Sequence, residues 1–132
     1  MNGERENNPH CFVCGEENPC GLHLSFRTEG GKATAEFAPS PTHQGYRNLT
    51  HGGIIAAVLD EAMIQAALGA GIAPMTAEIT VRFRKPFPTD TQRAIVEAEL
   101  TRNSARLVEA AARLLDARDG SLIAEAQAKL VL

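Results

Sequence analysis

The sequence predicts an α+β domain in which one long buried helix is wrapped by an antiparallel sheet of about six strands. Residues 52–68 predict the helix, because they are apolar on nearly every side and carry polar side chains only at Asp60, Glu61 and Gln65. Stretches of alternating apolar and polar residues on both sides of the helix predict the strands. The length of 132 residues, with 44% hydrophobic and 22% charged residues, suits one globular domain.

Charge and composition argue against two classes of partner. The net charge is −3, and the chain has no Trp and one Tyr, so neither a basic surface nor base-stacking aromatics favour nucleic acid. The apolar run over residues 52–59 is too short to cross a bilayer. The polar start, MNGERENN, lacks the apolar segment of a signal peptide. We therefore expect a cytoplasmic protein that binds neither nucleic acid nor a membrane.

Three cysteines lie in an N-terminal loop over residues 1–20, with the spacing Cys-x2-Cys-x5-Cys. Their odd number argues against a disulfide framework. Cys11, Cys14, Cys20 and His23 are a possible tetrahedral zinc set, but zinc sites usually combine two separated pairs, and only one Cys-x2-Cys is present. The sequence favours a cysteine-bearing turn without a metal.

The first strands are predicted on either side of a glycine pair. Residues 21–28 alternate, with Leu22, Leu24 and Phe26 on one face, as in a half-buried strand. Gly30-Gly31 is a hairpin signal, and residues 32–37 return with a second alternation.

The chain after the helix is predicted to add four strands. Gly69 and Gly71 are candidates for the helix C-cap. Residues 76–85 alternate so that Ala77, Ile79, Val81 and Phe83 form an apolar face, which leaves Thr76 on the polar face. Three long strands joined by hairpins follow, in residues 91–102, 105–115 and 122–132, with turns at Asn103-Ser104 and Asp119-Gly120.

Two adjacent acids inside the apolar helix are the first functional candidates, because burying an unpaired carboxylate is costly. Asp60 shares its side of the helix with mostly small apolar residues, which leave room for a substrate: Ala56, Ala57, Met63, Ile64 and Ala67. Glu61 points about 100° away, toward Val58 and Gln65. Helix geometry therefore favours Asp60 over Glu61 as a catalytic acid.

Several stretches resemble the phenylacetic-acid-degradation (PaaI-like) type of hotdog-fold acyl-CoA thioesterase. HGGIIAAVLDEA, residues 51–62, is similar to the family signature, in which Asp stands nine positions after the His of His-Gly-Gly. CFVCGEENPCGLHLSF and HQGYRNLTHGG are similar to the opening and the approach loop of one branch, and TAEITVRFRKP resembles the strand after the helix. The resemblance covers most of the chain and implies the hotdog fold.

The resemblance also implies roles for single residues. The backbone N–H of Gly53 or Gly52 would polarise a thioester carbonyl, as suits the unpaired amides of a helix start. Asp60 would act as general base or nucleophile. Thr76 matches a position that holds water, and Gln44 resembles an amide residue of the approach loop, although it lies one residue further from the glycines than in many relatives.

The remaining candidate site residues can also be explained by structural roles. His51 is a candidate site residue, but we favour a role in capping the helix over base chemistry. Arg82, Arg84 and Lys85 are candidates for binding the phosphates of coenzyme A, or else form a solvated strand face. Ile64 departs from relatives that carry Thr one turn after the acid.

The sequence therefore predicts a homo-oligomeric acyl-CoA thioesterase, a dimer or tetramer, that needs no metal or redox cofactor. Coenzyme A enters as part of the substrate. A non-catalytic acyl-CoA binding module is the alternative, followed by a zinc-stabilised interaction domain. His51 and Asp60 are nine positions apart, about 13 Å along a helix, so one chain cannot bring both the amides and the acid to one carbonyl. We expect an active site shared across a two-fold dimer.

Overall fold

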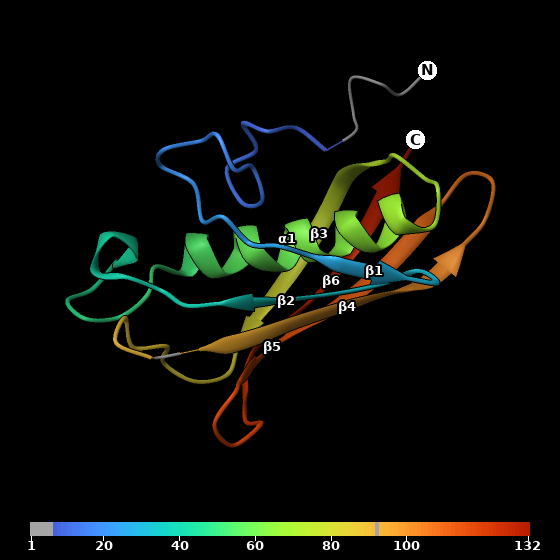
Figure 1. The fold of residues 1–132 in the computed structure, drawn as a ribbon. Coiled ribbons are helices and arrows are strands. Elements are labelled where there is room, and N and C mark those ends of the chain that lie inside the picture. The colour runs from blue at the N-terminus through green and yellow to red at the C-terminus, as the bar shows by residue number, and fades with distance from the viewer. Residues whose placement is uncertain (1–6, 92) are drawn as a thin grey trace.

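The computed structural model describes residues 7–91 and 93–132, and within them one helix packs on a six-stranded antiparallel sheet (Figure 1). The sheet has the strand order β1-β2-β4-β5-β6-β3. This is the predicted hotdog architecture. The elements are β1 (Arg27–Glu29), β2 (Lys32–Phe37), the short 3-10 helix η2 (Pro41–His43), α1 (Gly52–Gly69), β3 (Met75–Phe83), β4 (Ala94–Asn103), β5 (Val108–Asp116) and β6 (Leu122–Val131).

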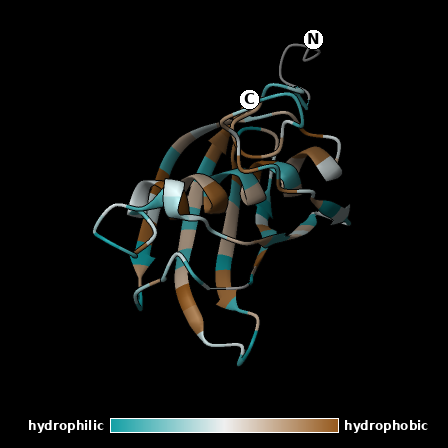
Figure 2. Cartoon of the chain, turned by 60° about the vertical axis from the view of Figure 1, so that its left-hand side comes forward, coloured by the Kyte–Doolittle hydropathy of each residue, from teal (hydrophilic) through white to brown (hydrophobic). Residues whose placement is uncertain are grey.

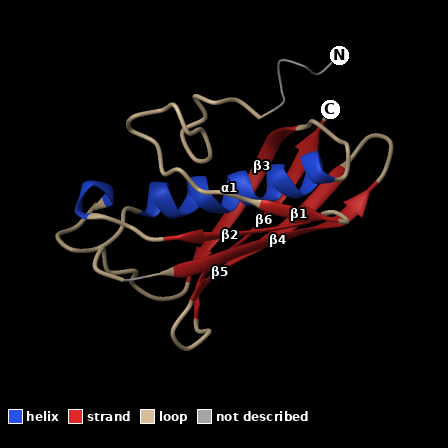
Figure 3. Ribbon diagram, in the orientation of Figure 1, coloured by secondary structure: helices blue, strands red, loops and turns tan. Residues whose placement is uncertain are grey.

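The core lies between α1 and the face of the sheet that curves around it (Figure 3). Val58, Leu59 and Met63 of the helix are fully buried. Most sheet positions that face them carry alanine, whose small side chain lets a helix approach closely: Ala33, Ala35, Ala94, Ala98, Ala110, Ala112, Ala124, Ala126 and Ala128. The outward positions of the strands are more polar, so colours alternate along them in Figure 2.

Both ends of α1 are capped as short-range chemistry requires. His51 is the N-cap, and its Nδ1 accepts a hydrogen bond from the Gly53 N–H at 2.8 Å. At the other end Gly71 takes a φ of +82°, and the Ile72 N–H donates to the Ala67 carbonyl at 2.9 Å. By length and composition α1 would also suit a membrane span, but 44% of its residues are buried inside this domain, as in the core helix of a globular fold.

A β-bulge in β3 changes which side chains face the helix. The pairing of β3 with β6 shifts between Thr76 and Glu78, so Ala77 has no partner in the ladder. The extra residue puts Thr76 on the same face as Ile79, opposite the buried Leu130 of β6. The prediction of Ala77 on the apolar face and Thr76 on the polar face was therefore wrong, because a strict period of two does not survive a bulge.

The segment before β1 packs on α1 without joining the sheet (Figure 1). The strand predicted over residues 21–28 is present only from Arg27, because the preceding residues bond to the cysteine turn instead. The Leu22 N–H donates to the Phe12 carbonyl at 2.8 Å, and the Leu24 N–H donates to Val13 at 2.9 Å. The alternation is nevertheless real, since Leu24 is buried.

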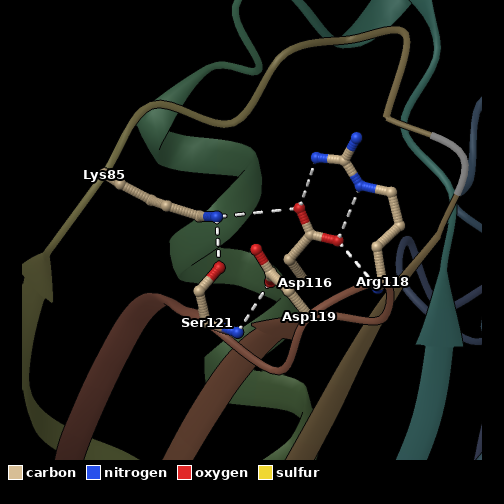
Figure 4. Close-up of polar contacts among 5 residues, drawn as sticks. All are labelled: Lys85, Asp116, Arg118, Asp119 and Ser121. Atoms are coloured by element: carbon tan, nitrogen blue, oxygen red, sulfur yellow. Dashed lines mark hydrogen bonds and ion pairs between the residues drawn. The ribbon is translucent and has the colours of Figure 1, made fainter.

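A buried aspartate ties the β5–β6 hairpin to the segment that follows β3 (Figure 4). The side chain of Asp116 is 4% exposed and forms ion pairs with Arg118 at 3.0 Å and Lys85 at 3.6 Å. Hydrogen bonds from the Arg118 side chain and backbone N–H lower the pKa of Asp116 from 3.8 to about 2. Lys85 also donates a hydrogen bond to the Ser121 hydroxyl. The Asp116 carboxylate therefore connects the turn between β5 and β6 with the segment after β3.

The lowered pKa of Asp116 predicts part of the acid sensitivity of the fold. The folded protein holds this proton less tightly than the unfolded chain does, so ionised Asp116 stabilises the fold. That contribution is present above the unfolded value of 3.8 and is lost as the pH falls to about 2. Asp116→Asn should therefore lower stability at neutral pH and flatten the pH dependence of unfolding between these values, measured by denaturant titration. The exposed Glu16→Gln serves as control, and an unchanged profile in the Asp116 variant would contradict this role.

Candidate functional site

A groove lies at the start of α1, where the approach loop and the end of β3 meet. Its volume is about 920 Å³, and Gln44, Thr50, His51, Gly52 and Phe83 are among the residues that line it. Tyr46 on its rim is 86% exposed. The groove therefore combines apolar walls with the positive end of the helix dipole, which suits a ligand with a polar, electron-rich atom.

The two glycine amides at the helix start differ in their hydrogen bonding. The Gly53 N–H is bound to His51 Nδ1, so that ring nitrogen carries no proton. The Gly52 N–H has no acceptor among the described residues. The Thr50 hydroxyl is buried in the same groove and also lacks a partner within that part of the chain. The capping role favoured for His51 is thus what its geometry supports.

Asp60 lies on the side of α1 that faces β3. Thr76 donates its hydroxyl hydrogen to Asp60 Oδ1 at 2.6 Å, a contact that the β3 bulge makes possible. This bond fixes one carboxylate oxygen, while Oδ2 has no hydrogen-bond donor among the described residues. Asp60 is partly exposed, as are Ala56, Ala57 and Ile64 on its side of the helix. Met63 and Ala67, expected beside it, are instead buried in the core.

Glu61 points about 100° away from Asp60 around α1, toward the N-terminal segment. Its carboxylate accepts a hydrogen bond from Gln65 Nε2 at 2.7 Å and contacts the sulfurs of Cys11 and Cys14 at 3.7 and 3.6 Å. Burial raises the pKa of Glu61, and the neighbouring charge of Asp60 adds to the rise. Burial likewise raises the pKa of the Cys14 thiol. The carboxylates of Asp60 and Glu61 therefore lie in different environments.

Gln44 holds the approach loop rather than pointing freely into solvent. Its Oε1 accepts a hydrogen bond from the Asn48 N–H at 2.9 Å. Asn48 has a φ of +63°, in the left-handed region that Asn tolerates better than most residues. An isolated bridge between Gln44 and Thr50 closes the same loop. The side chain thus shapes the groove wall, and its amide nitrogen has no acceptor in the described chain.

The three basic candidates for phosphate binding are not equivalent. Arg84 pairs with Glu125 at 2.6 Å, and Lys85 belongs to the Asp116 cluster. Arg82 is exposed and makes no ion pair with a described residue. Arg84 and Lys85 also line the groove at the helix start, whereas Arg82 does not. A phosphate at the groove would therefore compete with existing ion pairs.

The groove and the Asp60–Thr76 pair are separate within one chain. Asp60 and Thr76 do not line the groove. Asp60 follows Gly52 by eight helical positions, a rise of about 12 Å. A carbonyl carbon must approach its nucleophile to roughly 3–3.5 Å while its oxygen meets the donor amide. For such a reaction, the Gly52 amide and the Asp60 carboxylate of one copy would therefore be two separate half-sites.

Comparison with known proteins identifies the family. The model of the thioesterase superfamily matches residues 48–123, from the approach loop to the start of β6. The chain belongs to the thioesterase superfamily. The match includes the groove residues of α1, Asp60 and Thr76. No curated protein sequence matches the chain significantly.

Solved structures agree on the fold. The thioesterase superfamily protein RHA08564 aligns with a TM-score of 0.87 at 24% identity, over 94% of this chain, which spans 61% of that protein's length. A mutant of the phenylacetic acid degradation protein PaaI from Thermus thermophilus aligns with a TM-score of 0.76 at 19% identity, over 83% of this chain and 93% of the PaaI chain. The protein smu.793 from Streptococcus mutans, bound to acetyl CoA, aligns with a TM-score of 0.77 at 12% identity, over 82% of this chain and 86% of that protein. In its fold, this member of the thioesterase superfamily is thus similar to PaaI.

Sequence reasoning missed two features of the site. The pairing of Thr76 with Asp60 depends on the bulge, which the alternating pattern of β3 does not signal. The convergence of Cys11 and Cys14 on Glu61 crosses about 50 positions of sequence and depends on how the N-terminal segment folds back. Cys20 is exposed, and His23 Nε2 bonds to the Asn18 carbonyl at 2.6 Å. The ligand set considered from spacing alone is therefore not the one that forms a cluster.

The capping bond predicts a measurable stability effect at His51. His51→Ala removes the acceptor of the Gly53 N–H and should lower the free energy of unfolding by about 1 kcal/mol, as loss of an N-cap does. His51→Asn restores a good capping residue and should recover most of it. Chemical denaturation of these variants, with the exposed His10→Ala as control, checks the assignment. If the alanine variant is as stable as wild type, His51 does not cap the helix.

Proposed function

We propose that the protein hydrolyses an acyl-CoA thioester to a free acid and coenzyme A. The observation that carries the proposal is the pair of half-sites described above: a free amide at a helix start, and an oriented carboxylate on the exposed side of the same helix. Membership of the thioesterase superfamily supports this class of reaction. The complex of the similarly folded smu.793 with acetyl CoA supports the choice of thiol.

The helix start would bind the thioester carbonyl oxygen. The Gly52 N–H points out of the first turn with no competing acceptor in the described chain, and the helix dipole favours the negative charge that develops on the oxygen. The Gly53 N–H becomes a second donor if the carbonyl replaces His51 Nδ1. A Cβ at Gly52 would already contact the ring of Phe83 at 3.4 Å, so a larger side chain at this position would crowd the donor amide.

Asp60 would provide the base or the nucleophile. As a base it removes a proton from water, whose oxygen attacks the carbonyl carbon to give a tetrahedral oxyanion. Collapse of the oxyanion breaks the C–S bond, and the thiolate of coenzyme A takes the proton from Asp60. As a nucleophile Asp60 would attack the carbonyl carbon and expel the thiolate of coenzyme A, which leaves a mixed anhydride. Water would then hydrolyse the anhydride to the free acid and ionised Asp60, and the proton released in this step would protonate the thiolate. In both cases the bond from Thr76 keeps one carboxylate oxygen fixed and leaves the other to react. Neither route uses a metal or redox cofactor.

A second copy of the chain would complete the site. The edge strand β3 has one unpaired side, and Met75 and Phe83 at its ends are each 55% exposed. The face of α1 that carries Asp60 is apolar and partly exposed, so it needs cover. Two helices packed antiparallel about a two-fold axis would bring the Gly52 amide of each copy to the Asp60 of the other. We propose this dimer as the smallest active unit, in the cytoplasm; a tetramer would add a further interface.

The phosphates of coenzyme A would lie near the basic residues at the groove. Arg84 and Lys85 line it, and the exposed Arg82 lies on β3 just before them. Guanidinium groups bind phosphate in a bidentate manner, so Arg84 would exchange Glu125 for the ligand. A protein that binds acyl-CoA without hydrolysing it is the remaining alternative, and the assay below distinguishes the two.

Release of thiol from a panel of acyl-CoA substrates tests the proposal. The wild type should hydrolyse at least one member. Asp60→Asn keeps the side-chain shape and the contact with Thr76 but cannot accept a proton, so kcat should fall by at least about 10²-fold. Glu61→Gln, one residue away on the other side of the helix, should lose far less. Circular dichroism establishes that both variants are folded. Binding without turnover by the wild type would favour the non-catalytic alternative, and a larger loss in the Glu61 variant would refute the role of Asp60.

A further inference from the structure

Three metal-binding side chains converge at Glu61, about 100° around α1 from Asp60. The Cys11 and Cys14 sulfurs and a carboxylate oxygen of Glu61 all lie within 4.8 Å of one another. Two come from one turn of the N-terminal segment and the third from the middle of the core helix, and all three are partly buried. The proposed hydrolysis uses none of them.

The sulfur–oxygen distances in this cluster are close to the spacing of neighbouring ligands in a tetrahedral zinc site. Zinc bonds of about 2.3 Å to sulfur and about 2.1 Å to oxygen put neighbouring S and O ligands about 3.6 Å apart. The Cys11 sulfur lies 3.7 Å from Glu61 Oε1, and the Cys14 sulfur lies 3.6 Å from Glu61 Oε2, so each sulfur has this spacing to one oxygen of the carboxylate. In addition the Cys14 N–H points at the Cys11 sulfur at 3.5 Å, a backbone donor that would stabilise a thiolate. The turn thus presents both sulfurs to the Glu61 carboxylate.

The surroundings orient the ligands and supply no competing cation. Gln65, 5% exposed, donates Nε2 to Glu61 Oε2 at 2.7 Å and contacts the Cys14 sulfur at 3.7 Å, as an outer residue of a metal site does. The same Nε2 donates to Asn7 Oδ1 at 2.6 Å, which fixes the amide. No Lys or Arg of the described chain forms an ion pair with Glu61. Three acidic groups therefore share a half-buried space without a positive charge.

We propose that Cys11, Cys14 and Glu61 bind one zinc ion, with water in the fourth position. On binding, the two thiols lose their protons to solvent, and the sulfurs exchange weak S–H hydrogen bonds with Glu61 for bonds to the metal. The charges of two thiolates and one carboxylate are balanced largely by the divalent cation. This assignment replaces the expectation of a metal-free cysteine turn, because Glu61 supplies a ligand that the cysteine spacing does not reveal.

The zinc would fasten the N-terminal segment to the core helix. That segment holds few backbone bonds to the rest of the domain, whereas the cluster joins it to α1 directly beside Asp60. A ligand that binds only the folded state raises stability by mass action. The site is therefore structural, and its readouts, metal content and thermal stability, are independent of the proposed hydrolysis.

Titration of the full, reduced chain with Co²⁺ after metal removal tests the site, because cobalt bound by thiolates in a tetrahedron has characteristic charge-transfer and d–d absorption. The wild type should bind one equivalent, and Zn²⁺ should displace it and raise the Tm. Cys11→Ser, Cys14→Ser and Glu61→Gln should each weaken Co²⁺ binding by at least about tenfold. Cys20→Ser, an exposed cysteine of the same segment, should bind as the wild type does.

Three results would overturn the proposal. The first is the absence of thiolate-to-cobalt absorption in reduced wild-type protein. The second is an equal loss in Cys20→Ser, which would indicate unspecific thiol binding. The third is full affinity in Glu61→Gln, which would leave only the two cysteines as ligands. Circular dichroism of each metal-free variant excludes unfolding as the cause of any loss.

Discussion

The rotational position of α1 on the sheet is the constraint on which the other features depend. Its buried stripe packs against strands whose inward positions are mostly alanine, so the helix has little freedom to roll without creating voids. With that stripe fixed, the 100° step between successive residues turns Asp60 and Glu61 toward different neighbours. Asp60 meets Thr76 of β3, and Glu61 meets Gln65 and the cysteine turn. One packing arrangement thus separates the proposed reacting acid from the proposed metal ligand.

The distance along the axis of α1 also constrains the site, because Gly52 lies at the start of the helix and Asp60 at its middle. The free Gly52 amide depends on where the helix begins, and His51 fixes that point by accepting a hydrogen bond from the Gly53 N–H. The carboxylate depends on a position more than two turns later. A helix long enough to bury this core therefore cannot present both groups to one small carbonyl, and the exposed β3 edge with its apolar helix face is where a second copy would supply the other half.

Most of the fold was predictable because its elements carry strong local signals. The apolar run from Gly52, the alternation over residues 32–37 and the Asp119-Gly120 turn each indicate one structure. The failures have physical causes. The bulge in β3 exchanges the sheet faces on which Thr76 and Ala77 lie. The backbone of Leu22 and Leu24 bonds to the segment around the Cys11–Cys14 turn and not to the sheet. Of the site, helical phase correctly separated Asp60 from Glu61, and the capping of α1 by His51 fits the role that the sequence favoured. Long-range partners were out of reach, because contacts such as Glu61 with Cys14 or Lys85 with Asp116 follow from the topology, and no periodicity encodes them.

Mixing two inactive variants tests most directly whether two helices share one site. Asp60→Asn chains retain the donor amides, and Gly53→Val chains retain the acid but place a side chain against the His51 ring, where even a Cβ would lie 3.0 Å from Nδ1. After subunit exchange, half of the dimers are mixed and each holds one intact site, so about a quarter of wild-type hydrolysis should return. If exchange is demonstrated by mass-tagged chains and no activity above that of the parents returns, the two-chain site is wrong.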